Sequence, residues 1–283
     1  RGDEEDVSLF GYVSWASINH LGLLNASING GYIMGGITGE ADNSTISNCF
    51  VSGSVEGVEL VGGLVGALGN SELNNSYNLS RVSGSDYIGG LVGDGWNYDA
   101  EKGMSYSAVT NSYSAGSIRV ADPPEGNGEI KSGLQEVALN TRIPGRNPMG
   151  RYSKKGPKIG GVIGSFLAEG TIVITNSFWD VDKDGIDGTA SGTDNYGATG
   201  KTTEEMQDIN TFSDWDISPR ADVLADYPFL AWELDENGEK ADPVWIIGTL
   251  DPSAVPLSNA ALYLSFLLVG GLVFFRIYRM NQS

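Results

Sequence analysis

The sequence predicts an all-β protein. We expect a parallel β-solenoid (β-helix) of about five coils of ~27 residues, a small C-terminal capping region with one short helix, and then a single transmembrane helix. Three observations lead to this fold class. Two short words repeat along the chain at a nearly fixed spacing, and no apolar stripe with the helical period runs through the repeats. An uncharged apolar stretch stands near the C-terminus.

The first repeated word is rich in glycine. It reads GGITG at 35–39, GGLVG at 62–66 and 89–93, and GGVIG at 160–164, and its first three copies are separated by two steps of 27 residues. A fixed period of this length is typical of stacked repeats. Glycine tolerates the tight bends and close backbone approach inside a thin coil. The phosphate-binding patterns G-x-x-x-x-G-K-[ST] and G-x-G-x-x-G are absent, so the word is interpreted as architecture.

The second word combines β-branched or aromatic residues with a turn. It begins at Ile46, Leu73, Val109 and Ile174, with an earlier variant at Ile18, in steps of 28, 27, 36 and 65 residues. Short runs of this kind between Gly, Asn, Ser and Asp clusters predict strands. About three strands of ~5 residues fit one coil, and successive coils should rise by about 4.8 Å.

One asparagine holds the same turn position in each copy of the second word. An asparagine there tolerates left-handed backbone geometry, and stacked copies could form a hydrogen-bonded ladder. The four are Asn48, Asn75, Asn111 and Asn176.

Together the words resemble a known family. The pattern VGGLVG…NSY…GSV is similar to the GLUG-motif repeat of bacterial surface proteins, which occurs in adhesin-like proteins and beside the peptidase unit of some immunoglobulin-cleaving proteases. The resemblance runs from about Ile18 to about Trp232, and the segment from NSFWDVDKDG to YPFLAW resembles the part that closes such arrays. It implies a β-solenoid and an exported, surface location. It does not imply catalysis, because the peptidase unit is a separate domain and H-E-x-x-H is absent from this sequence.

The repeats and their interruptions divide the chain into six predicted segments. They are an N-terminal lead-in (1–17), the solenoid (18–180) with inserted loops at 96–104 and 121–158, a capping region (181–250), a linker (251–258), the transmembrane helix (259–279) and a cytoplasmic tail (280–283). In the capping region, 201–212 predicts the short helix, with Thr202 or Thr203 as its N-cap. We expect Trp215, Phe229 and Trp232 to close the open end of the stack.

The C-terminal stretch predicts a membrane anchor. Residues 260–275 carry no charge, and the uncharged run reaches nineteen residues when it is counted from Leu257. The arginines that follow place the C-terminus in the cytoplasm and the solenoid outside. The residues expected in contact with the membrane are Leu262, Phe266, Leu268, Phe274, Phe275, Arg276 and Arg279. The same tail is weakly similar to exosortase-type sorting tails, which are cut off.

Composition limits the classes of partner and of chemistry. The formal charge of −19 and the pI of about 4.2 exclude nucleic acid and anionic membrane surfaces as partners. The single cysteine, Cys49, can form no internal disulfide. Serine stands at the same place in the other copies of the second word, which suggests that Cys49 is a small packing residue. The single histidine, His20, is expected to be packed or in a turn rather than to act as a base. No catalytic residues are predicted.

An acidic run after the last coil suggests one cofactor, calcium. Asp180, Asp182 and Asp184 alternate before a glycine, and Asp187 follows, as at the start of a calcium-binding loop. The twelfth position is Ser191 rather than glutamate, so this is no EF-hand. An acidic turn without a bound ion is the alternative.

The second inserted loop ends in a cluster of positive charge, a candidate partner-binding patch. It contains Arg142, Arg146, Arg151, Lys154, Lys155 and Lys158 and no acidic residue. Inserted loops often form the binding face of a solenoid. The alternative is a solvated loop that lies on the acidic surface of the protein itself.

The expected function is that of a surface adhesion or structural binding module, not an enzyme. It would be anchored in the bacterial cell envelope by one helix, and its partner would be a surface glycan or a protein. One alternative is an accessory subunit of a membrane complex, whose helix contacts other subunits. Another is a carbohydrate-active enzyme on the same scaffold, which a carboxylate pair clustered in a groove would favour.

Overall fold

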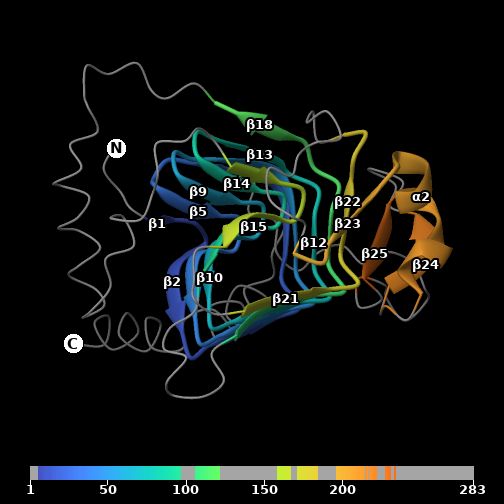
Figure 1. Ribbon diagram of the computed structural model, residues 1–283, viewed down its shortest axis with the longest axis horizontal. Coiled ribbons are helices and arrows are strands. Elements are labelled where there is room, and N and C mark those ends of the chain that lie inside the picture. The colour runs from blue at the N-terminus through green and yellow to red at the C-terminus, as the bar shows by residue number, and fades with distance from the viewer. Residues whose placement is uncertain are drawn as a thin grey trace, which may run out of the picture. The chain divides into compact units, whose positions relative to one another are not determined.

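In the computed structural model, each coil contributes strands to four sheets, and equivalent strands of successive coils pair in parallel (Figure 1). The structure describes residues 6–96, 106–121, 158–166, 171–183, 196–213, 215, 217–221, 227–230 and 233. The protein is therefore all-β with parallel sheets, as predicted. Four sheet positions per coil replace the three strands that the coil length suggested.

Sheets A and B form the first half of each coil. Sheet A consists of β1 (Asp6–Val7), β5 (Ile33–Gly35), β9 (Leu60–Gly62), β14 (Tyr87–Gly89) and β19 (Lys158–Gly160). Sheet B consists of β2 (Phe10–Ser14), β6 (Thr38–Asp42), β10 (Val65–Gly69), β15 (Val92–Trp96) and β20 (Ile163–Phe166).

Sheets C and D form the second half. Sheet C consists of β3 (Ser17–Asn19), β7 (Thr45–Ser47), β11 (Glu72–Asn74), β16 (Tyr106–Thr110) and β21 (Thr171–Thr175). Sheet D consists of β4 (Gly22–Asn29), β8 (Phe50–Glu56), β12 (Tyr77–Asn78), β13 (Arg81–Gly84), β17 (Tyr113–Ser114), β18 (Ile118–Val120), β22 (Phe178–Asp180) and β23 (Thr199–Lys201).

The register matches the repeat of the sequence. Hydrogen bonds between neighbouring coils join residues 27 apart in the early coils, then 36 and 65 apart after the insertions. The first insertion follows β15 and the second follows β18; residues 97–105 and 122–157 lie outside the described part. The stack begins at Asp6 in β1 rather than at Ile18, because β1 and β2 already pair with the second coil.

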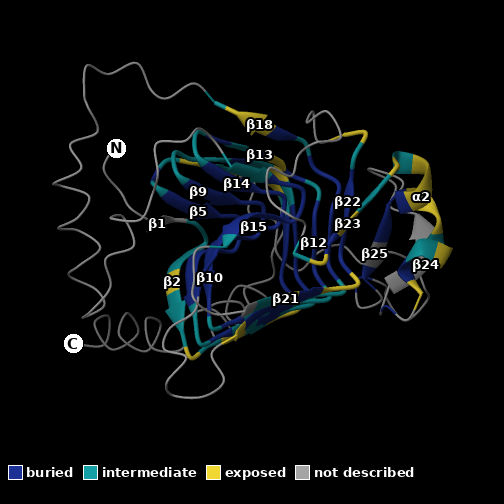
Figure 2. Cartoon of the chain, in the orientation of Figure 1, coloured by how far each residue is buried: buried dark blue, intermediate teal, exposed yellow. Residues whose placement is uncertain are grey.

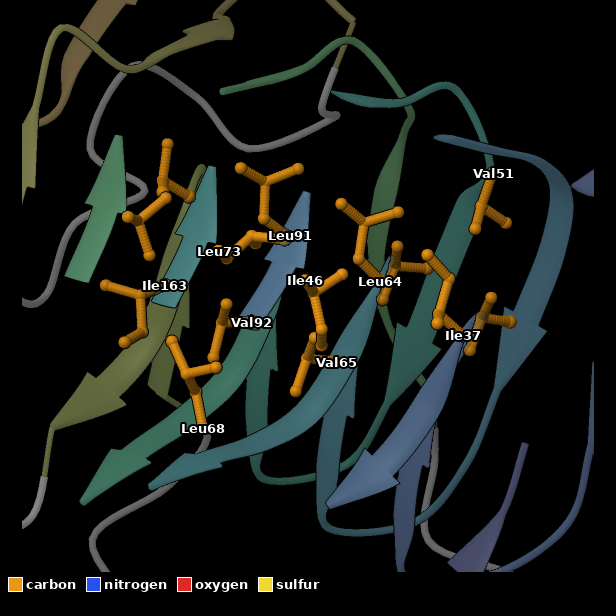
Figure 3. Packing of buried hydrophobic residues seen from close by; sticks show 14 of the residues in the cluster. Ile37, Ile46, Val51, Leu64, Val65, Leu68, Leu73, Leu91, Val92 and Ile163 are labelled. Carbon is orange, nitrogen blue, oxygen red and sulfur yellow. The ribbon is translucent and has the colours of Figure 1, made fainter. Parts of the chain in front are cut away.

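The core is a column of aliphatic side chains that stack on their equivalents. Ile37, Leu64 and Leu91 are fully buried at one position, and Ile46, Leu73 and Val109 at another (Figure 3). In-register stacking brings the same side-chain shapes together at each level. Each inner coil therefore packs its apolar side chains against those of two neighbouring coils, and each terminal coil against those of one.

The repeated glycine word forms the bend between sheets A and B, which is here called the A–B corner. A Cβ on Gly63 would collide with Asn78 of sheet D, across the interior. A Cβ on Gly66 would lie 2.7 Å from the backbone nitrogen of Met34 in β5, well inside van der Waals contact. The word is mostly glycine because backbones approach each other too closely at this corner for side chains.

The asparagine of the second word turns each coil from sheet C into sheet D. Asn48, Asn75, Asn111 and Asn176 all have positive φ, from 45° to 53°, as predicted. The predicted ladder exists as two hydrogen-bonded segments. Asn48 donates to Asn19 (2.9 Å) and Asn75 donates to Asn48, while Asn176 donates to Asn111 (2.9 Å). The side-chain amides thus connect the coils outside the apolar core.

The capping region packs on the side of sheet D. Phe50 and Tyr77 stack with ring centroids 5.0 Å apart, and Tyr77 and Tyr113 with centroids 5.1 Å apart. Trp215 lies parallel to Phe178 at 5.5 Å and belongs to the same cluster. The prediction that Trp215 closes the end of the stack is therefore wrong, because Trp215 packs on the aromatic column that runs across several coils of sheet D. The side chain of Phe229, and Trp232, lie outside the described residues.

The predicted helix 201–212 is present in two pieces, α2 (Thr203–Gln207) and the 3-10 helix η3 (Ile209–Phe212). Thr202 caps α2 in a capping box with Glu205, while Asp208 leaves helical geometry and caps η3. The hairpin β24 (Ile217–Ala221) and β25 (Pro228–Leu230) completes the described cap, which has its exposed side away from sheet D (Figure 2).

The chain divides into two units, residues 1–248 and 249–283. The second unit contains the predicted linker, transmembrane helix and tail, and it lies outside the described residues. Within the described part of the chain, no helix has the length and apolarity needed to cross a membrane.

Candidate functional site

Sheet C offers an exposed outer face that is mostly polar. In its middle coils the central residue of each strand, such as Ile46 or Leu73, points into the core, and its neighbours point outward. The outward residues are Ser17, Asn19, Thr45, Ser47, Glu72, Asn74, Tyr106, Thr110, Val173 and Thr175, all at least partly exposed (Figure 2).

Hydrogen bonds between coils hold some of these side chains in place. Ser47 donates to Asn19 at 3.1 Å, and Tyr106 donates to Glu72 at 2.6 Å. The face is thus a five-stranded parallel surface on which equivalent positions of successive coils stand in register. Such a surface can bind an extended partner without reorganising.

The predicted calcium ligands lie where the last coil meets the cap. The Asp180 carboxylate is 1% exposed and accepts hydrogen bonds from the hydroxyls of Thr203 (2.8 Å) and Tyr227 and from the Asp182 backbone (2.9 Å). The Asp182 carboxylate accepts the Thr203 backbone N–H at 2.9 Å. Burial and the hydrogen bond to Asp180 raise the pKa of Tyr227, so this hydroxyl remains a donor at neutral pH.

Protein O–H and N–H donors contact both oxygens of the Asp180 carboxylate. A carboxylate that binds a metal ion can keep such hydrogen bonds, so these contacts do not decide for or against calcium. In the described part of the chain, no three His, Cys, Asp or Glu side chains are grouped as a metal site. Asp184 and Asp187 lie outside the described residues, so calcium binding stays a prediction. The geometry supports a clamp that fixes the cap to the stack.

Only one member of the predicted basic patch belongs to the described residues. Lys158 starts β19 in sheet A rather than ending a loop, and its backbone donates to Asp86 at 2.7 Å. Its ammonium lies 5.4 Å from the centre of the Tyr87 ring. Burial raises the pKa of the Asp86 carboxyl to about 6, and the nearby Lys158 partly opposes this shift. The partner-binding role of the other five, Arg142, Arg146, Arg151, Lys154 and Lys155, stays a prediction.

Two buried acids stand in one column of sheet B. Glu40 is 6% and Asp94 is 2% exposed, and the register places Ala67 between them. Ala67 belongs to a third apolar cluster, with Tyr87 of sheet A and Trp96 of sheet B. Two strand spacings separate the acids, which corresponds to roughly 10 Å between their backbones. This pair could not be predicted from the sequence, because only the strand register aligns the two positions.

The cysteine and the histidine have structural roles. Cys49 is fully buried in a column with Ser76, whose hydroxyl accepts the Cys49 backbone N–H at 3.1 Å. Burial raises the pKa of its thiol to about 12, which leaves it protonated. His20 is an exposed turn residue with φ of 56°, at the position that asparagine holds in later coils. Among the predicted alternatives, the turn is therefore confirmed.

Comparison with known proteins adds one match. No model of a known protein family matches the chain, and no curated protein does. The chain is similar in structure to a candidate immunoglobulin A1 protease from Bacteroides ovatus, with a TM-score of 0.47 and 17% sequence identity over 82% of this chain and 73% of that protein. At this identity and TM-score, the match assigns neither a family nor an activity to the chain.

Proposed function

We propose that the protein is a binding module of the bacterial cell surface, in which the β-solenoid is a rigid scaffold and the outer face of sheet C contacts the partner. The exposed, in-register sheet C supports this proposal, because its polar side chains are prepositioned and lie away from the described cap on sheet D. The partner would be a surface glycan or protein. The GLUG-type character of the repeats, the envelope location and the anchor at 259–279 belong to the same proposal.

The experiment uses the full chain in detergent or nanodiscs, applied to an array of envelope polysaccharides and matrix proteins. A double variant, Ser47→Arg with Asn74→Arg, places two long charged side chains on sheet C. Binding should fall at least tenfold, while Val120→Arg, an exposed position of sheet D, serves as the control. Unchanged binding by the double variant would contradict the assignment of the face.

Location is tested in the bacterium that produces the protein. Antibodies against the solenoid should label intact cells, and the protein should stay in the membrane fraction after an alkaline wash. Labelling only after cell lysis would contradict an outward-facing module.

A carbohydrate-active enzyme is the second candidate, and the Glu40–Asp94 column favours it. The two acids stand in one column of sheet B, two strand spacings apart, and a glycosidase needs two carboxyl groups that act together on one bond. Release of reducing ends from polysaccharides by the full chain, lost in both Glu40→Gln and Asp94→Asn, would support it. Equal release by wild type and variants would exclude this pair.

A further inference from the structure

Trp15 is the most exposed large apolar side chain of the described residues, at 82% exposure. It stands at the turn from sheet B to sheet C and has φ of 54°, a left-handed conformation that is rare for a bulky residue. Pairing of Ser14 with Asp42, and of Asp42 with Gly69, makes Asn43 and Asn70 its equivalents in the next two coils. Both have positive φ too. The first coil therefore has a strained, exposed tryptophan where the fold favours asparagine.

Hydrogen bonds connect three polar side chains next to the backbone of this position. Tyr12, 40% exposed on β2, donates its hydroxyl to Asp42 at 3.5 Å. The Asn43 amide donates to the other Asp42 oxygen at 2.9 Å, and the Trp15 backbone donates to the Asp42 carbonyl at 3.0 Å. Asp42 thus holds the Tyr12 hydroxyl and the Asn43 amide with its carboxylate and the Trp15 backbone with its carbonyl.

We propose that Trp15, Tyr12, Asp42 and Asn43 form a binding subsite for a neutral sugar residue. A pyranose ring has an apolar face of C–H groups that packs on an indole, and hydroxyl groups at its edge that pair with carboxylates, amides and phenols. The rigid aromatic rings lose little conformational entropy on binding. A charge of −19, with Glu40 and Asp42 in the same strand, disfavours acidic sugars. The subsite lies at the edge of sheet C where β3 begins at Ser17, so a saccharide chain can continue onto that face.

This inference rests on the proposed function and specifies its partner. The test uses Trp15→Asn, which installs the residue of the equivalent positions in place of tryptophan. The variant should keep or raise the melting temperature, because asparagine tolerates the left-handed conformation, so lost binding would not reflect misfolding. Val120→Asn replaces another exposed apolar residue, away from the subsite, and is the control.

The probe is an array of neutral and acidic oligosaccharides, followed by titration of the best neutral one with the full chain. We expect binding of a neutral oligosaccharide that falls at least tenfold in Trp15→Asn and clearly in Asp42→Asn, and is unchanged in Val120→Asn. The saccharide should also protect the fluorescence of the wild type from acrylamide more than that of Trp15→Asn, because Trp15 is exposed whereas the other tryptophans of the described residues, Trp96, Trp179 and Trp215, are buried.

Two outcomes would overturn the inference. If no neutral oligosaccharide binds, the sugar assignment fails, while binding of a protein through sheet C would leave the proposed function intact. If a neutral oligosaccharide binds equally well to Trp15→Asn, glycan binding stands but the subsite lies elsewhere.

Discussion

Replacement of Gly66 by alanine tests the assignment of the glycine word to the A–B corner. The added methyl carbon would lie 2.6 Å from the Gly39 carbonyl oxygen and 2.7 Å from the Met34 nitrogen. Both are backbone atoms of a neighbouring coil and cannot turn away as a side chain can. Overpacking typically costs about 1–3 kcal/mol, and more where the surroundings are rigid. We therefore expect a loss of about 3 kcal/mol, or a fall of roughly 6–12 °C in the melting temperature for a domain of this size.

Gly57→Ala is the matched control. Its new methyl group would meet side-chain atoms of Met34 and Val61, and methionine adapts easily. This variant should lose less than about 1 kcal/mol. The measurement is thermal and urea unfolding followed by circular dichroism. Equal losses in the two variants, or a neutral Gly66→Ala, would refute a close backbone contact at the corner.

Three further predictions concern the clamp, the buried acid and the thiol. Asp180→Ala removes the acceptor of two hydroxyls, including that of buried Tyr227, and should cost about 2–4 kcal/mol in urea unfolding; a loss below about 1 kcal/mol would contradict the clamp. Because the pKa of Asp86 is raised to about 6 in the folded protein, its contribution to stability falls as the pH rises from about 4 to 6. Asp86→Asn should therefore be more stable than wild type by up to about 1 kcal/mol at pH 7, after allowance for partial exposure, with no difference near pH 4; an equal difference at both pH values would contradict this. Cys49 should react with a thiol reagent only after unfolding, and Cys49→Ser should change stability by less than about 1 kcal/mol, because Ser76 holds the equivalent place; reaction in the folded state would show that the thiol is accessible.

The repeat could be predicted from the sequence because equivalent positions of stacked coils have the same surroundings and therefore need similar residues. Gly62 and Gly63 stand at the same corner as their counterparts one coil later, so the spacing of the word is the length of the coil. The left-handed turn at Asn48 could also be predicted, since few residues other than asparagine and glycine accept that geometry.

The positions of side chains distant in sequence could not be predicted. The partners of Asp180 are Thr203 and Tyr227, which reach it only because the cap folds back onto sheet D. The alternating aspartates predict calcium, which stays a prediction, but they do not reveal that Asp180 connects the cap to the last coil. Trp15 could not be identified from the sequence, because the first coil matches the repeated words poorly. Only the strand register shows that this tryptophan occupies a position that asparagine holds in the next coil, at Asn43.

The exposed face of sheet C exists only if all five coils stack in register. The distance between a residue of the first coil and its equivalent in the last coil tests this stacking directly. Asn19 and Thr175 are exposed, far apart in the chain, and in the same column of sheet C. Four strand spacings of about 4.8 Å place their backbones about 19 Å apart. Nitroxide labels on cysteines at these two positions, measured by pulsed electron paramagnetic resonance, should give a narrow distribution near 20 Å. A distance beyond about 30 Å, or a broad distribution, would contradict the stacking.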